Sequence, residues 1–233
     1  DIDSATLKAL VDKVGADGTG SEDDTIEIFV GTPPGSTGLS VTFPQAGFAG
    51  LAESTSADLS ISSQLITITL DGQAVDTVAG AATGGSVTVS AHVVQPQDLT
   101  PENQARVAGR PVYDLTITAG GRTVSDFGGG TATITVPYTL RPGEDPDAVV
   151  VWFLADDGSL QSVNGRYDAA TGQVTFTTSH FSEFVIGYNL VAFDDVPNDA
   201  WYRPAVTFIA ARGITTGVGD GMYGPEQTLT RGQ

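Results

Sequence analysis

Few residues of this 233-residue chain have side chains suited to catalysis or metal binding. The chain has no cysteine and two histidines, His92 and His180, so a zinc site is not expected. Paired carboxylates occur at Asp156–Asp157 and Asp194–Asp195, but both pairs are adjacent in turns and fit hairpin chemistry better than the paired acids of a glycosidase. The sequence has no G-x-S-x-G motif, no P-loop and no dinucleotide fingerprint. We therefore expect no catalytic residue, no metal ion and no cofactor.

One tripeptide, His180-Phe181-Ser182, carries residue types that a self-cleavage reaction needs. It resembles the H-[LF]-[ST] cleavage sites of GAIN domains and similar autoproteolytic modules. The resemblance implies that His180 is a general base, that the Ser182 hydroxyl attacks the Phe181 carbonyl, and that water then hydrolyses the ester. In the alternative interpretation, Phe181 is a core residue at a strand bend and His180 is hydrogen-bonded nearby. Because a tripeptide is a weak signal, the structural interpretation is preferred.

The stretch from Phe193 to Gln233 has the most ordered pattern in the chain. An acidic turn at Phe193–Asp195 opens it, and an amphipathic helix is expected to start at Trp201–Tyr202, with Pro204 in its first turn. Gly213 is expected to end that helix as a left-handed cap. The apolar residues spaced for one buried face of the helix are Ala205, Phe208 and Ile209.

In this order, the residues of this stretch resemble an S-layer homology (SLH) module. The family pattern is roughly F-x-D-V, W-[AY], a helix, G-[IV]-x-x-G, G-D-G-x-[FY]-x-P and a closing [IL]-T-R-[AG]-[EQ]. So many matches in order are far more specific than a three-residue motif. The resemblance implies a Gram-positive surface protein that binds a cell-wall polysaccharide without catalysis. The matching residues are Phe193, Asp195–Val196, Trp201–Tyr202, Gly213–Ile214, Gly217, Gly219 to Gly221, Tyr223, Pro225 and Leu229 to Gln233.

The SLH resemblance also implies which residues bind the secondary cell-wall polysaccharide: Trp201, Gly217, Asp220, Thr230 and Arg231. The sugars are typically pyruvylated, and a guanidinium can grip the pyruvate carboxylate in a bidentate manner. An indole face covers a sugar ring, and glycines let backbone N–H groups approach an anion. In the alternative interpretation, Trp201 packs in the core and Arg231 pairs with an aspartate. SLH anchors usually pack three repeats, so we expect further repeats or a homo-oligomer.

The composition excludes several classes of partner. The net charge of −18 repels nucleic acid and anionic lipid, and it favours solubility. No apolar run approaches the length needed to cross a bilayer, so membrane insertion is not expected. The start of the chain, Asp1-Ile2-Asp3, is not a signal peptide. Because an SLH protein must be exported, we expect the chain to be a mature fragment of a longer extracellular protein.

The remaining sequence favours strands and turns over helices. Glycine occurs 29 times and proline 12 times, alongside abundant threonine, valine and serine. Segments such as Thr25–Val30, Leu39–Phe43 and Ala148–Leu154 read as strands, and about ten such segments come at the spacing of a β-sandwich. We therefore predict a mainly β fold, sandwich-like with a few short helices, followed by a small α-helical SLH repeat.

Two domains are predicted: a β-rich extracellular domain over 1–188, with a subdomain break near 95–110, and a partial SLH module over 189–233. The segments PVYDLTI, VPY and HFS of the first domain resemble a β-rich module that often precedes SLH repeats and has no assigned activity. Two other functions stay open. The chain is then either the anchor fragment of a larger surface enzyme or a subunit of a self-assembling S-layer lattice or filament.

Overall fold

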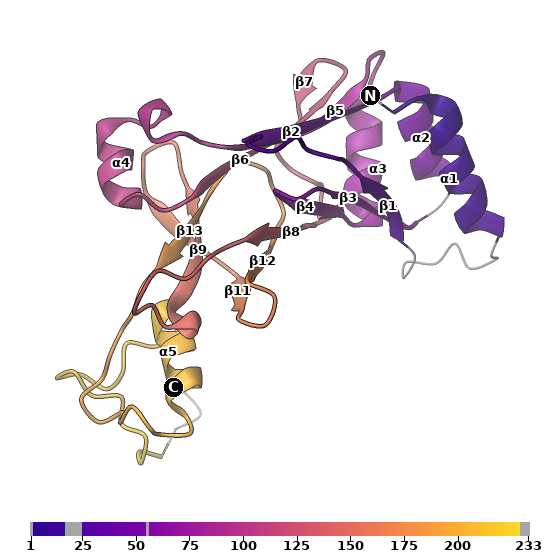
Figure 1. Cartoon of the computed structure of the whole chain (residues 1–233). Helices are drawn as coiled ribbons and strands as arrows, with labels where there is room; N and C mark the ends of the chain where they lie inside the picture. The colour runs from indigo at the N-terminus through magenta and orange to yellow at the C-terminus, as the bar shows by residue number, and fades with distance from the viewer. Residues whose placement is uncertain (1, 17–24, 55, 229–233) are drawn as a thin grey trace.

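A computed structural model describes residues 2–16, 25–54 and 56–228 of the chain (Figure 1). Within these residues the strands form two sheets, one of six strands and one of seven. The first sheet has, in spatial order, β1 (Thr25–Phe29), β3 (Asp58–Ser62), β4 (Thr67–Leu70), β8 (Ala132–Pro137), β12 (Gln173–Thr178) and β11 (Gly165–Asp168). The second has β10 (Leu160–Val163), β9 (Val149–Leu154), β13 (Glu183–Tyr188), β6 (Val112–Ala119), β5 (Val87–Val93) and β2 (Gly38–Phe43), with β7 (Arg122–Thr123) paired to β6.

The helices of the described residues are short and lie around the sheets (Figure 1). Three of them gather at one end of the molecule, and α5 lies at the other end, below the strands β9 and β11. The predicted mainly β fold with a few short helices is thereby confirmed. The helices are α1 (Ser4–Ala16), α2 (Gln45–Ser54), α3 (Gly72–Ala81), α4 (Pro101–Val107) and α5 (Arg203–Ala211), with 3-10 turns η1 (Pro96–Asp98) and η2 (Pro146–Ala148).

One continuous hydrophobic core joins the inward faces of both sheets. Alternation of buried and less buried residues along strands such as β6 and β12 supplies it. Helices α1, α2 and α3 contribute to the same core through Leu7, Phe48 and Val78. The core reaches from Leu7 to Ile186 along the chain. The predicted boundary at 188–189 and the break near 95–110 stay predictions, although β5 and β6 pair across the latter.

Polar side chains cap the first turns of two helices. The Asp71 carboxylate caps α3 by accepting a hydrogen bond from the Ala74 N–H, and Thr100 caps α4 in the same way through the Asn103 N–H. The alternating stretch Asp58 to Leu70 folds into β3 and β4, which pair antiparallel. Strand β1 pairs with β3 in parallel, a long-range contact for which the alternation of Thr25–Val30 gave no signal.

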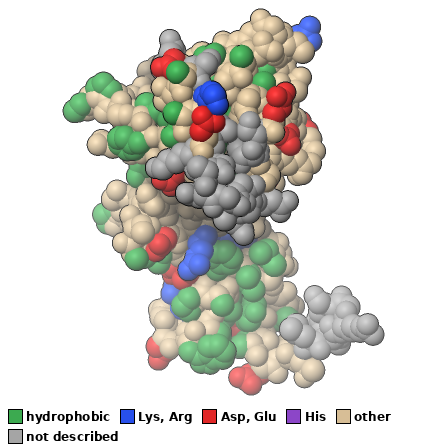
Figure 2. Space-filling model, turned by 90° about the vertical axis from the view of Figure 1, so that its right-hand side faces the viewer, with side chains coloured by type: hydrophobic (Ala, Val, Ile, Leu, Met, Phe, Trp, Pro, Cys, Tyr) green, Lys and Arg blue, Asp and Glu red, His purple; other side chains and the backbone are tan. Residues whose placement is uncertain are grey.

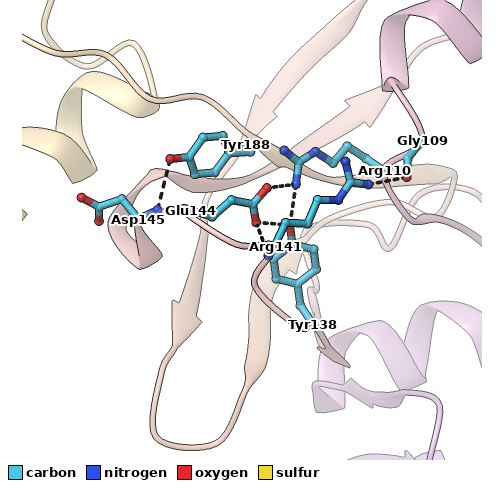
Figure 3. A network of polar contacts seen from close by, with 7 residues as sticks. All are labelled: Gly109, Arg110, Tyr138, Arg141, Glu144, Asp145 and Tyr188. Atoms are coloured by element: carbon cyan, nitrogen blue, oxygen red, sulfur yellow. Dashed lines mark hydrogen bonds and ion pairs between the residues drawn. The ribbon is translucent and has the colours of Figure 1, made fainter.

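A cluster of polar side chains, which we call the Glu144 network, fixes the loop between β8 and β9 (Figure 3). Arg110 forms an ion pair with Glu144, whose carboxylate also accepts hydrogen bonds from the Tyr138 hydroxyl at 2.8 Å and the Arg141 N–H at 3.0 Å. The side chains of Arg110 and Glu144 are 13% and 7% exposed. The Tyr188 hydroxyl accepts from the next residue of this loop, so the network ties the loop to β13.

Candidate functional site

Helix α5 begins the module that carries the SLH pattern. Pro204 lies in its first turn, where the missing N–H costs no helical hydrogen bond. Gly213 follows its last residues with φ +68°, and its N–H reaches the Ala210 carbonyl at 3.0 Å, as the predicted left-handed cap requires. The helix therefore starts and ends where its proline and glycine place it.

The buried face of α5 differs from the predicted one. Val206 and Ala210 are buried against Phe193, whereas Ala205 is exposed and Phe208 and Ile209 are half-buried. The prediction of Ala205, Phe208 and Ile209 as the buried face is wrong because α5 is apolar on more than one side. Spacing alone does not decide which apolar side of such a helix meets the core.

Asp195 holds the loop after α5 against the acidic turn that opens the module. Its two carboxylate oxygens accept the backbone N–H groups of Tyr223 and Gly224, both at 2.7 Å. Alongside this clamp, the Asp194 N–H donates to the Gly221 carbonyl at 2.9 Å, and the Phe193 ring packs on the Tyr223 ring with centroids 5.6 Å apart. The order of the pattern thus has a physical basis, because its first and later parts are in contact.

The Asp195 clamp makes the loop sensitive to acid. The Tyr223 N–H, and then the Gly224 N–H, hold the pKa of Asp195 below its ordinary value. A lowered folded-state pKa gives stability that is present above the unfolded-state pKa and is lost as pH falls through the folded-state value. We predict that the amide NMR signals of Tyr223 and Gly224 shift together at a midpoint below the ordinary aspartate range. Asp195→Asn abolishes this shift, and pH-independent amide signals in the unmodified protein would contradict the prediction.

Gly217 is fixed by the backbone on both sides of the loop. Its φ is +75°, and a Cβ at this position would lie 2.2 Å from the Met222 carbonyl oxygen and 2.7 Å from the Phe193 ring. The Val218 N–H also donates to the Met222 carbonyl at 2.8 Å, and the Met222 N–H donates to Gly219, which closes a small hairpin. Glycine at position 217 is therefore required by the close packing of the loop backbone against Met222 and Phe193.

An open pocket of about 410 Å³ lies beside this hairpin. Gly217 lines it, together with the hydroxyl-bearing side chains of Thr215, Thr216 and Thr228 and the Tyr223 ring. Hydroxyl groups can donate and accept, and an aromatic ring can cover a sugar face, so the lining is chemically suited to a carbohydrate. The sequence alone does not identify these threonines as binding residues, because single threonines in a turn carry no spacing signal.

The other predicted binding residues have different surroundings. Trp201 is 91% exposed, with its ring edge-on to Tyr202, so it does not pack in the core of the described residues. Asp220 is exposed at the tip of the hairpin with φ +52°. Neither is among the described residues that line the pocket. Thr230 and Arg231 lie outside the described residues.

The His180-Phe181-Ser182 tripeptide lies between β12 and β13. The His180 ring packs edge-on against Phe153, with centroids 4.9 Å apart, and its Nδ1 lies 3.4 Å from the Thr178 hydroxyl. Phe181 is buried against the core, and the Ser182 carbonyl accepts a hydrogen bond from strand β6. These contacts fit a strand bend beside the core, and whether the chain cleaves itself stays a prediction.

In the described residues, the β-rich part of the chain is followed by the helix α5 and the loop that Asp195 holds. Residues 192–233 match the family model of the S-layer homology domain. The chain therefore contains an SLH domain, and SLH domains in general anchor surface proteins to secondary polysaccharides of the cell wall. Among the described residues, no helix has the length and apolar character that a membrane span requires.

A curated relative also matches the chain. An amylopullulanase of Thermoanaerobacterium thermosulfurigenes is 29% identical over 101 residues, which cover 43% of this chain and 5% of that protein. The chain thus spans a small part of the length of this relative. No solved structure matches the chain.

Proposed function

We propose that this chain is a non-catalytic part of a bacterial surface protein, and that its SLH domain binds a pyruvylated wall polysaccharide. The observation that carries the proposal is the SLH match over residues 192–233, joined to a loop whose glycines and Asp195 hold an open pocket. The pocket offers hydroxyl groups and the Tyr223 ring to a sugar. The exposed Trp201 offers an indole face to a second sugar unit.

The anionic part of the ligand needs a cation, and Arg231 is the proposed one. A guanidinium can grip a pyruvate carboxylate with two parallel hydrogen bonds, which an ammonium cannot do. Both carboxylate oxygens of Asp195 already accept backbone N–H groups, so this aspartate is engaged within the loop. Thr230 and Asp220 are proposed as polar partners of the same ligand.

The module also exposes apolar side chains that a further SLH-type repeat would cover. Figure 2 shows hydrophobic side chains gathered on one face of the lower body of the molecule. Contiguous exposed apolar patches often mark interaction surfaces. We propose that this face packs against another repeat or another copy of the chain. Among the module residues that the structure describes, large exposed apolar side chains are those of Leu190, Trp201, Ile214, Val218 and Met222.

Binding to cell-wall sacculi tests the role of Arg231. We predict that Arg231→Ala in the full-length protein lowers the fraction that pellets with sacculi, because the pyruvate carboxylate loses its bidentate partner. Arg122→Ala is the matched control, since it removes the same charge from an exposed position on the short strand β7. Pelleting of the Arg231→Ala protein equal to that of the control and the unmodified protein would refute the assignment.

A second candidate function has one observation in its favour. The relative named amylopullulanase is an enzyme of which the chain matches 5% of the length, so the chain is alternatively the anchor fragment of a larger surface enzyme. The SLH domain has the same role in both cases. Assays of the full-length protein for hydrolysis of glycans test this second candidate, because an anchor fragment of a glycan-degrading enzyme requires such activity and its absence would contradict the candidate.

A further inference from the structure

The end of helix α5 is tied to the β-domain by one side chain, Arg212. Its guanidinium donates to the Gly165 carbonyl from Nε at 3.2 Å and from Nη2 at 2.7 Å, and to the Val149 carbonyl at 2.9 Å. Its Nη1 donates to the Asp147 carbonyl at 3.2 Å and back to Phe208 at 3.0 Å. A guanidinium has five N–H donors. Arg212 uses them on carbonyls of β11, β9, η2 and its own helix.

Other contacts hold α5 at the same place. Arg203, at the start of the helix, forms an ion pair with Asp145 at 3.0 Å. Ala211 is buried against Ala148 of η2, and the Asn189 side chain donates to the Ala211 carbonyl at 2.7 Å. Both ends of the helix therefore contact the loop between β8 and β9, which the Glu144 network fixes. Figure 1 shows α5 beside this part of the β-domain.

The Arg212 guanidinium is a partly desolvated cation. Burial lowers the pKa of Arg212 to about 10, while the negative charge of Asp147 opposes that shift. The guanidinium also stacks on the Phe208 ring, with 3.4 Å between its carbon and the ring centroid. A charge is buried at this cost only where its donors are satisfied. Arg212 is thus an integral contact between α5 and the β-domain, which we call the Arg212 joint, and not a surface side chain that lies loosely on the sheet.

We propose that Arg212 pins the first SLH helix to the β-domain, so that the two parts form one body and the wall anchor holds the β-domain at a fixed orientation. The described residues of the module, Trp201 and Gly217 among them, then move together with the sandwich. The fixed orientation comes from the contacts of Arg212 and does not depend on which ligand the module binds. The sequence gives no sign of it, because a lone arginine near a helix end is ordinary.

The joint is tested by distances between two spin labels in the 233-residue chain. Because the chain has no cysteine, Gln173→Cys on β12 and Asp199→Cys in the module create two unique, exposed labelling sites. The proposal expects one narrow distance distribution in this labelled protein. Arg212→Met in the same background is expected to lose the narrow peak, and Arg122→Met is expected to keep it. Arg212→Lys keeps the positive charge, but an ammonium has fewer N–H donors than a guanidinium. This variant is therefore also expected to broaden the distance distribution.

A second variant guards against misfolding of the first. Arg203→Met removes the tie at the other end of the helix, which is a single ion pair with Asp145, and a smaller broadening is expected. Far-UV circular dichroism identifies any variant that has lost its sheets. A broad distribution in the labelled parent protein would overturn the proposal. So would a narrow peak in folded Arg212→Lys and Arg203→Met proteins, or equal broadening in Arg122→Met.

Discussion

Replacing Arg110 with methionine is expected to lower the free energy of unfolding by about 3 kcal/mol, since removing one partner of a buried ion pair strands the other charge. The stranded group is Glu144, whose side chain is 7% exposed. Tyr138 and the Arg141 N–H would still donate to its carboxylate, but neither carries the compensating charge at the carboxylate. For a chain of this size, we expect the melting temperature to fall by about 10 °C.

The pH dependence of this loss identifies its cause. Burial raises the pKa of Glu144, but hydrogen bonds from Arg141, Tyr138 and Arg110 outweigh it and leave the pKa below its ordinary value. The carboxylate therefore stabilises the fold above its unfolded-state pKa, and this contribution disappears as pH falls through the folded-state pKa. Without Arg110 the pKa of Glu144 rises. Protonation of Glu144 at low pH then removes the unpaired buried charge that destabilises the variant. The stability difference between Arg110→Met and the unmodified protein should shrink from pH 7 to pH 4.

Urea unfolding at both pH values measures the effect. Lys8→Met is the control, because it breaks an exposed ion pair with Asp12 in which both side chains are more than half exposed, and such pairs contribute little. An Arg110→Met protein as stable as Lys8→Met at pH 7 would contradict this account of the Glu144 network. A stability deficit that is unchanged at pH 4 would show that a stranded carboxylate is not its cause.

Replacing Gly217 with alanine is expected to destabilise the loop of the SLH domain by about 3 kcal/mol, through backbone strain at positive φ and overpacking. The new Cβ meets the Met222 carbonyl oxygen at 2.2 Å and the Phe193 ring at 2.7 Å, and backbone atoms cannot yield as a flexible side chain does. The loop must therefore move away from the turn that Asp195 holds. We expect loss of binding to sacculi as a consequence.

The matched control for this change is Gly213→Ala. Gly213 has φ +68°, close to that of Gly217, but a Cβ there has open space around it. This control measures backbone strain alone, for which about 1 kcal/mol is expected. Amide hydrogen exchange at Tyr223 and Gly224, which donate to Asp195, compares the two variants. Equal protection of these amides in Gly217→Ala and Gly213→Ala would refute the close contact.

What the sequence predicted correctly depended on local signals. Pro204 and Gly213 act within one helical turn, and they start and end α5 as expected. The SLH pattern is likewise local, and the contacts of Asp195 with the later loop give it a physical cause.

What could not be predicted depends on contacts between distant parts of the chain. The parallel pairing of β1 with β3 and the buried face of α5 are chosen by tertiary packing among several apolar alternatives. Arg212 meets carbonyls of residues 47 to 65 positions earlier in the chain, and no periodicity connects them. Of the predicted binding residues, Gly217 lines the pocket and Trp201 is exposed elsewhere on the module, and their role in binding stays a prediction.

Wall anchoring through the SLH domain is tested most directly by co-sedimentation of the full-length protein with sacculi before and after removal of their secondary polysaccharide. The account predicts that the protein pellets with intact sacculi and stays in solution with stripped ones. Added soluble pyruvylated polysaccharide should also release it from intact sacculi. Equal pelleting with intact and stripped sacculi would contradict the account.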